Sequence, residues 1–289
     1  MTTNILLLLA LLLILLGLLG VEVYGHWQWQ QKTIRIHNRL VAQTVYTTPQ
    51  GPKRVDFAEL EDLPFVVQRY LREALTDGQP LITQVQAEHQ GQFNLGGATQ
   101  RWFPFTSQQR VMIQPPGFLW DAQISPIPGI AQVLVHDAYI GGEGILTASL
   151  GGWISMMKIQ ARGAISQGEL QRFLAEALWY PTALLPSQGV KWIALDETTA
   201  QVILRDGLII ITMTVYFNAQ GLVDRVQVED RVRAVGDRFI PTPWEGRFWD
   251  YQRWGQMLIP LQGEVAWLLP EGRCPYWRGT LTSVDYTFI

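Results

Sequence analysis

The stretch Gln84-Val-Gln-Ala-Glu-His-Gln90 sets the pattern of the chain, because Val85, Ala87 and His89 alternate with glutamines and a glutamate. A period of two places the two sets of side chains on opposite faces of a β-strand, so the stretch predicts a half-buried strand. Similar segments follow, separated by Gly- and Pro-containing turns at roughly 8–12-residue spacing, which is typical of an antiparallel sheet. They are expected at 100–105, 109–113, 118–124, 132–139 and 144–150.

One helix interrupts this rhythm. Ser166-x-x-Glu169 has the form of a capping box, and Leu170, Phe173 and Leu174 follow it at helical spacing. Strand-like segments resume at 190–195, 200–205, 208–217, 223–233, 247–251, 258–268 and 277–288. The number of expected strands is too large for a flat open sheet. We therefore expect a mainly β (α+β) protein, in which an N-terminal transmembrane helix precedes a large curved antiparallel sheet or half-barrel with a few covering helices.

An unbroken apolar run, Ile5 to Val21, precedes these strands. A helix extended from it to Tyr24 would be roughly 30 Å long, which is about the thickness of the hydrocarbon core of a bilayer. We interpret the run as a single-pass membrane anchor, with Tyr24, Trp27 and Trp29 in the interfacial aromatic belt. The alternative is a cleaved signal sequence, although the preceding MTTN lacks the basic residues typical of one.

We therefore expect an anchor (1–25), a juxtamembrane segment and linker (26–56) and a single β-rich domain (57–289). The juxtamembrane segment is expected to continue the helix to about Val45, before the Pro/Gly-rich linker at 47–54. A first domain helix is expected with Asp62 near its cap and Pro64 in its first turn.

The charges flanking the run bear on which side of the membrane the domain occupies. Lys32, Arg35 and Arg39 follow the run, so the positive-inside rule favours the cytoplasm. A resemblance to exported proteins favours the other side. Both sides are kept as alternatives.

Composition excludes several classes of function. A net charge of −3 without a basic cluster is not the electrostatic pattern of a nucleic-acid-binding protein. The single cysteine, Cys274, rules out an intramolecular disulfide and a cysteine-rich metal site. The common nucleotide-, zinc- and nucleophile-elbow motifs are absent from the sequence, so no cofactor, metal or catalytic residue is expected. His136 and Asp137 are neighbours on a strand and should face opposite ways, which disfavours a paired acid–base role.

Aromatic residues make up 11% of the chain, and many fall in strand-like segments. We expect some of them to line a cavity for a membrane lipid or hydrophobic small molecule, while the alternative is that they fill a large β core. The candidate lining residues are Trp102, Phe105, Trp120, Phe173, Trp179, Trp192, Trp244 and Trp267. Arg172 and Glu176 share one stripe of the predicted helix with Glu169 and, together with Asp250, are candidates for orienting a polar head group. A solvated helix face with weak ion pairs is the alternative for this stripe.

Three functions fit these patterns. The first is a membrane-tethered module that binds a lipid or other hydrophobic ligand without catalysis. The second is an enzyme for a hydrophobic substrate with Glu176, Asp250 or Glu245 as acid or base, because a desolvated carboxylate can have a raised pKa. The third is a structural or assembly partner of membrane proteins that uses its aromatic residues as an interface. Protein partners are left open.

The block from Gly168 to Pro186, GELQRFLAEALWYPTALLP, resembles a bacterial family known only as a domain of unknown function. Further matches lie at 243–246, 263–267 and 276–279, and the likeness covers most of 63–289. It implies no established reaction and no catalytic residues. The architecture is also similar to the outer-membrane lipoprotein carrier superfamily, which implies a half-open β-barrel whose helices cover an apolar pocket for acyl chains. The expected anchor departs from a freely moving carrier and fits better a tethered acceptor, or a receiver that handles lipid at one membrane.

Overall fold

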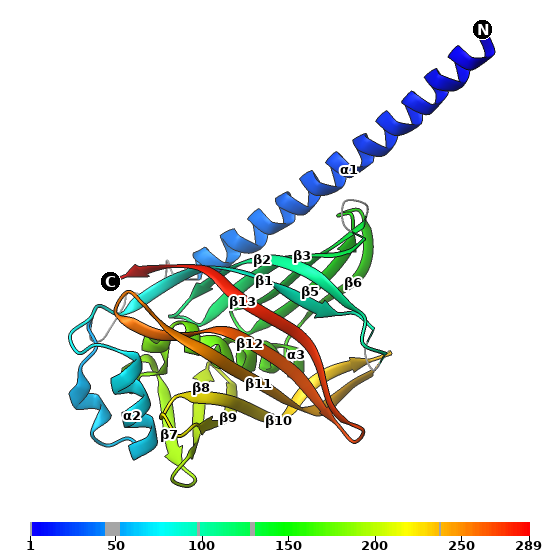
Figure 1. The fold of residues 1–289 in the computed structure, drawn as a ribbon. Coiled ribbons are helices and arrows are strands. Elements are labelled where there is room, and N and C mark those ends of the chain that lie inside the picture. Colours follow the sequence, from blue (N-terminus) through cyan, green and yellow to red (C-terminus); the bar gives the residue numbers. More distant parts are fainter. Residues whose placement is uncertain (1, 44–52, 97–98, 128–130, 237) are drawn as a thin grey trace.

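The strands form a single open, curled antiparallel sheet (Figure 1). The structure is a computed structural model that describes residues 2–43, 53–96, 99–127, 131–236 and 238–289. Its 13 strands follow the order β6-β5-β4-β3-β2-β1-β13-β12-β11-β10-β9-β8-β7. The mainly β class, with few helices and an apolar N-terminal helix, is confirmed.

Two antiparallel meanders make up this sheet, and they meet where β1 pairs with β13. The first meander contains β1 (Ile82–Asn94), β2 (Trp102–Met112), β3 (Gly117–Ile127), β4 (Ala131–Ile140), β5 (Glu143–Leu150) and β6 (Ile154–Ala161). The second contains β7 (Val190–Ala194), β8 (Thr199–Asp206), β9 (Ile209–Phe217), β10 (Val223–Val235), β11 (Arg238–Trp254), β12 (Met257–Leu269) and β13 (Gly272–Phe288). Gly91 and Gly279 face each other in the β1–β13 pair, where a Cβ on Gly91 would collide with the β13 backbone.

A helical connection crosses the concave side of the sheet. It consists of α3 (Ala164–Ala175) and three short 3₁₀ helices, η3 (Glu176–Trp179), η4 (Pro181–Leu184) and η5 (Pro186–Gln188). Because it joins β6 to β7, which are the two outer edges of the sheet, it must span the opening between them. Accordingly, α3 contacts β3, β4 and β5 of one meander and β9 and β10 of the other (Figure 1).

The predicted capping box at the start of this helix is wrong. The helix begins at Ala164 after Gly163, and no side chain among the described residues caps it. The Ser166 hydroxyl donates to the Gly163 carbonyl oxygen, and Glu169 is buried three residues further on, beside Arg231. The capping-box sequence fails here because tertiary contacts use its glutamate.

A second helical layer closes one end of the sheet. It consists of η1 (Phe57–Leu60) and α2 (Phe65–Ala74), whose buried face includes Val67, Tyr70 and Leu71. Asp56 caps η1 by accepting a hydrogen bond from the Ala58 amide. Pro64 is the N-cap of α2 and so precedes the first turn in which it was expected.

The N-terminal helix α1 (Thr2–Ala42) is continuous, so the helix does extend beyond the apolar run. Its stretch Leu6–Ala42 contains an 18-residue window of mean hydropathy 2.9 with none of the window buried, and length and composition alone make it a candidate membrane span or signal sequence. Figure 1 shows its N-terminal half projecting away from the sheet. Most of the expected linker at 47–54 lies outside the described residues.

The C-terminal half of α1 packs on the convex face of β3 and β4. Leu40 is fully buried there among Leu119, Ala138 and Ile140. Polar contacts add to this packing: the Trp29 indole donates to Asp121 Oδ1 at 3.0 Å, the Thr33 hydroxyl lies 2.7 Å from His136 Nε2, and the Trp29 and His136 rings stack with centroids 3.8 Å apart. The helix is therefore held to the outside of the sheet by both apolar and polar contacts.

Candidate ligand-binding cavity

A cavity of about 240 Å³ lies between the helical connection and the concave face of the sheet. Strand alternation supplies its wall, because residues of one parity face inward. On β11, the Trp244 and Phe248 side chains face inward. Arg247 and Trp249, the two neighbours of Phe248, are exposed. The aromatic residues lining it are Phe93, Trp120, Trp179, Trp244, Phe248, Trp267, Tyr276 and Trp277.

Hydrogen bonds fix several of these rings. The Trp179 indole donates to the Pro260 carbonyl at 3.0 Å, and the Trp244 indole donates to the Tyr276 hydroxyl at 2.9 Å. Tyr276 also stacks on Trp267, with ring centroids 5.7 Å apart. Since the indole N–H groups of Trp179 and Trp244 have partners, these two rings present apolar faces to the cavity in a fixed arrangement.

Arg172 of α3 forms the charged side of the cavity. Its guanidinium donates to Asp137 on β4 at 2.6 Å and to Glu176 at 2.7 Å, and it lies over the rings of Phe118 and Trp120 at 5.0 and 4.9 Å. Burial acts to lower the pKa of Arg172, but Glu176 and Asp137 outweigh it and raise that pKa. Arg172 is therefore a permanent, largely buried cation held between two carboxylates.

Glu169 lies one turn earlier on the same helix and faces Arg231 of β10, with 3.7 Å between their charged groups. Burial, reinforced by the nearby Asp137 carboxylate, raises the pKa of Glu169 well above its usual value. Among the described residues, Glu169 Oε2 and Asp137 Oδ1 are buried without a hydrogen-bond partner. These two oxygens are polar groups that the cavity offers to a ligand, and the raised pKa of Glu169 favours its protonated form, which donates as well as accepts a hydrogen bond.

His89 on β1 is buried behind this wall, with its ring centroid 4.6 Å from that of Trp179. Burial, helped by the Arg172 charge, lowers the pKa of His89 to about 3, so the imidazole is neutral. Neither ring nitrogen has a hydrogen-bond partner among the described residues. His136 faces α1 on the outside while Asp137 faces Arg172 on the inside, and this confirms that the two neighbours point in opposite directions.

Of the residues singled out from the sequence, six line the cavity: Trp120, Arg172, Glu176, Trp179, Trp244 and Trp267. Phe105 and Phe173 belong to the hydrophobic core outside the lining. Trp102 lies under the Arg278 guanidinium, 4.5 Å from its ring centroid, and the Trp192 indole donates to the Leu184 carbonyl. Asp250 is exposed on β11, at a positive φ of 58°.

Several lining residues were not singled out, notably Phe93, Asp137, Arg231, Phe248 and Trp277. Phe248 had a usable signal, because it has the same strand parity as Trp244 four residues before it. Asp137 and Arg231 had none, since their role depends on contacts with α3 that join distant parts of the chain.

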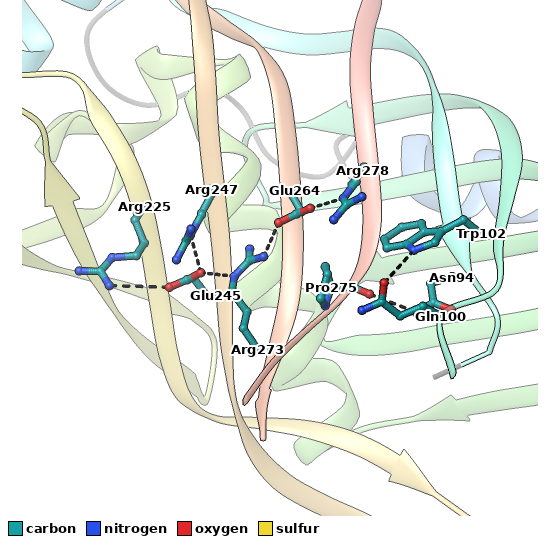
Figure 2. A network of polar contacts seen from close by, with 10 residues as sticks. All are labelled: Asn94, Gln100, Trp102, Arg225, Glu245, Arg247, Glu264, Arg273, Pro275 and Arg278. Atoms are coloured by element: carbon teal, nitrogen blue, oxygen red, sulfur yellow. Dashed lines mark hydrogen bonds and ion pairs between the residues drawn. The ribbon is translucent and has the colours of Figure 1, made fainter. Parts of the chain in front are cut away.

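Glu245 and Glu264 belong to a ladder of charges that crosses β10 to β13 (Figure 2). Glu245 is almost fully buried beneath arginines, accepting from Arg273 at 2.6 Å and from Arg247 at 2.7 Å. Glu264 in turn accepts from Arg273 and Arg278. The three carboxylates considered for catalysis are thus separated: Glu176 lies in the cavity, Glu245 in this ladder and Asp250 on the surface.

Comparison with known sequence families matches residues 61–286 to a family of unknown function (DUF6920), and the chain belongs to this family. The resemblance expected from the sequence is confirmed. No curated protein matches the chain. Among solved structures, it is similar to a LolA superfamily protein from Nitrosomonas europaea, with 7% identity, coverage of 78% of this chain and 93% of that one, and a TM-score of 0.39. It is also similar to a putative outer membrane lipoprotein-sorting protein domain from Vibrio parahaemolyticus, with 9% identity, coverage of 80% and 92%, and a TM-score of 0.40.

Proposed function

We propose that this member of a family of unknown function is a membrane-tethered module that binds one hydrophobic ligand, such as a lipid acyl chain, in the cavity beneath α3. The observation that carries the proposal is the aromatic-lined cavity of about 240 Å³ with a charged cluster on one side. Ligand sites typically combine such an apolar wall with a few placed polar groups, in volumes of roughly 300–1,000 Å³. The small volume here favours a single chain or a small hydrophobic molecule.

Burial of an acyl chain supplies enough free energy for such binding. Each buried methylene contributes about 0.8 kcal/mol, so ten carbons would contribute about 8 kcal/mol before ordering costs are subtracted. The charged cluster sets the orientation. The head group lies at Arg172, Asp137 and Glu169, and the chain lies along the aromatic wall.

The N-terminal helix gives this binding module its location. We assign residues 1–25 to a single-pass anchor and residues 57–289 to the binding domain, with 26–56 between them. The apolar, unburied window of α1 supports this assignment. The docking of Trp29, Thr33 and Leu40 on the sheet supports a domain held next to the membrane surface.

Filling the cavity tests the proposal. Val135 lines the cavity from β4, and Ala234 lines it from β10, so Val135→Trp and Ala234→Trp should each occupy the space of the ligand. Ile210→Trp is the matched control, because Ile210 is exposed on β9. Native mass spectrometry of the full chain extracted in detergent should show one firmly held lipid on the wild type and on the control.

The two cavity variants should lose that lipid while keeping the wild-type far-ultraviolet circular dichroism spectrum. If both folded variants hold the same lipid as the wild type, the ligand does not occupy this cavity and the proposal fails. Two variants at separate strands are used because either one alone could overpack and unfold.

A further inference from the structure

The edge strand β6 carries an exposed apolar surface. Trp153 in the β5–β6 turn is 55% exposed and Met156 is 60% exposed, and Ile154 and Met157 are exposed as well. Soluble proteins usually protect an edge strand with charges or prolines and rarely leave several large apolar side chains together in water. We call these four residues the hairpin patch.

The β5–β6 turn, which carries the hairpin patch, is fixed at one position along α1. A Cβ at Gly25 would collide with the Gly151 carbonyl, and a Cβ at Gly152 would collide with the Gly25 carbonyl, so the β5–β6 turn and the helix touch through bare backbone. The neighbouring His26 Nε2 lies 3.2 Å from Gln132 Oε1 on β4. The turn therefore cannot move along the helix without breaking this contact.

This contact lies close to the C-terminal end of the apolar run of α1. Gly25 follows Val21 by four residues, which is about 6 Å along a helix, while the head-group layer of a bilayer is roughly 5–8 Å deep on each side. Tyr24 and Trp27, which are 55% and 54% exposed, lie at the same level. If residues 5–21 cross the hydrocarbon core, the β5–β6 turn must lie within the head-group layer.

We infer that the hairpin patch, together with Tyr24 and Trp27, is a second membrane contact that rests on the lipid bilayer holding α1. The inference rests on the proposed tether and goes beyond it, because a single helix leaves the domain free to tilt whereas two contacts fix its orientation. Tryptophan and tyrosine suit this depth because their rings are apolar and their N–H and O–H groups reach water.

Strand pairing places one end of the cavity, at Phe93 and Trp277, toward the same end of the sheet as the β5–β6 turn. One row of paired residues crosses β5 to β1 through Leu150, Val133, Ile124, Phe105 and Gly91. The β5–β6 turn and the cavity residue Phe93 both lie beyond this row, and Trp277 pairs with Phe93 on β13. A domain resting on the hairpin patch thus turns the Phe93–Trp277 end of its cavity toward the bilayer.

Site-directed labelling of the full chain tests the contact. After Cys274→Ser removes the native thiol, single cysteines from Trp153→Cys, Ile193→Cys and Val23→Cys each receive an environment-sensitive nitrobenzoxadiazole dye. Ile193 is an exposed residue of β7, at the opposite edge of the sheet, and Val23 is an exposed residue of α1. The proteins are reconstituted in phosphatidylethanolamine–phosphatidylglycerol vesicles, with and without a lipid that carries a nitroxide quencher near the head group.

We expect blue-shifted emission and quenching by the nitroxide lipid at positions 153 and 23, and neither effect at 193. Quenching at 23 but not at 153 overturns the membrane contact and leaves the tether intact. No quenching at 23 overturns the tether itself, and the contact with it. A blue shift at 153 without quenching also overturns the inference, because it would show that protein rather than lipid covers the hairpin patch.

Discussion

Arg172→Met should be among the most destabilising substitutions in this protein. The Arg172 side chain is only 16% exposed and joins Asp137 and Glu176 by hydrogen bonds of 2.6 and 2.7 Å. Methionine preserves the apolar contact with Phe118 and Trp120 but leaves two carboxylates without their cation. Removal of one partner from a buried ion pair typically costs about 3–5 kcal/mol. For a domain of this size, each kcal/mol shifts the melting temperature by roughly 2–4 °C, so a decrease of roughly 6–20 °C is expected.

Arg253→Met is the matched control for this measurement. Arg253 pairs with Glu73 at 3.2 Å, but the two side chains are 56% and 54% exposed. Exposed ion pairs contribute about 0–1 kcal/mol, so the same chemical change should have little effect there. Urea unfolding of the full chain in detergent, followed by tryptophan fluorescence, gives both free energies. Equal losses for the two variants would refute the idea that the buried cluster is electrostatically tight.

Three further outcomes follow from the same contacts. Because the folded-state pKa of Glu169 is raised above 4.5, the contribution of this group to stability falls as pH rises above about 4.5. Glu169→Gln should therefore match the wild type at lower pH and become progressively more stable relative to it at higher pH in urea titrations. Leu40→Ala should weaken the docking of α1 by about 2–5 kcal/mol and speed amide hydrogen exchange at 26–42, while exchange in β8 and β9 stays unchanged. Burial acts to raise the pKa of Asp121, but the neighbouring His136 and the hydrogen bonds from Trp29 and Thr33 outweigh it and lower that pKa. The docking should therefore loosen as pH falls below about 3.8, which the same exchange experiment measures.

Local pattern was sufficient to predict the existence of most strands but not their limits. Two predicted strands, 100–105 and 109–113, are one strand, β2, because Ser107 and Gln109 face inward although they are polar. The strand predicted at 247–251 begins at Arg238, since Pro241 and Pro243 hid its first half. The strand β6 was not predicted. In its sequence, ISMMKIQA, two adjacent methionines break the alternation of apolar and polar residues, and its apolar residues are exposed on both faces.

The cavity was less predictable than the sheet. Aromatic residues occur on both faces of the strands, and sequence alone does not say which parity faces inward. Trp102 and Trp267 were equally plausible lining residues from the sequence, yet Trp102 lies beneath Arg278 and Trp267 lines the cavity. The inward face is decided by the pairing of β1 with β13 and by the path of α3, both of which join segments far apart in the chain.

The ion pairs of α3 explain how the sheet keeps its opening. Arg172 holds the helix to β4 of the first meander through Asp137, and Glu169 faces Arg231 on β10 of the second. Gln167 and Gln171 both donate to Asp230, next to Arg231. Buried charges are seldom the most stable way to fill a space, because apolar side chains of similar volume avoid the desolvation cost. Their directional contacts, however, fix where the helix sits between the two edges, whereas a wholly apolar helix could sink into the cavity and fill it. The same cluster therefore costs folding energy, keeps the space beneath α3 open and provides the polar end of the proposed ligand site.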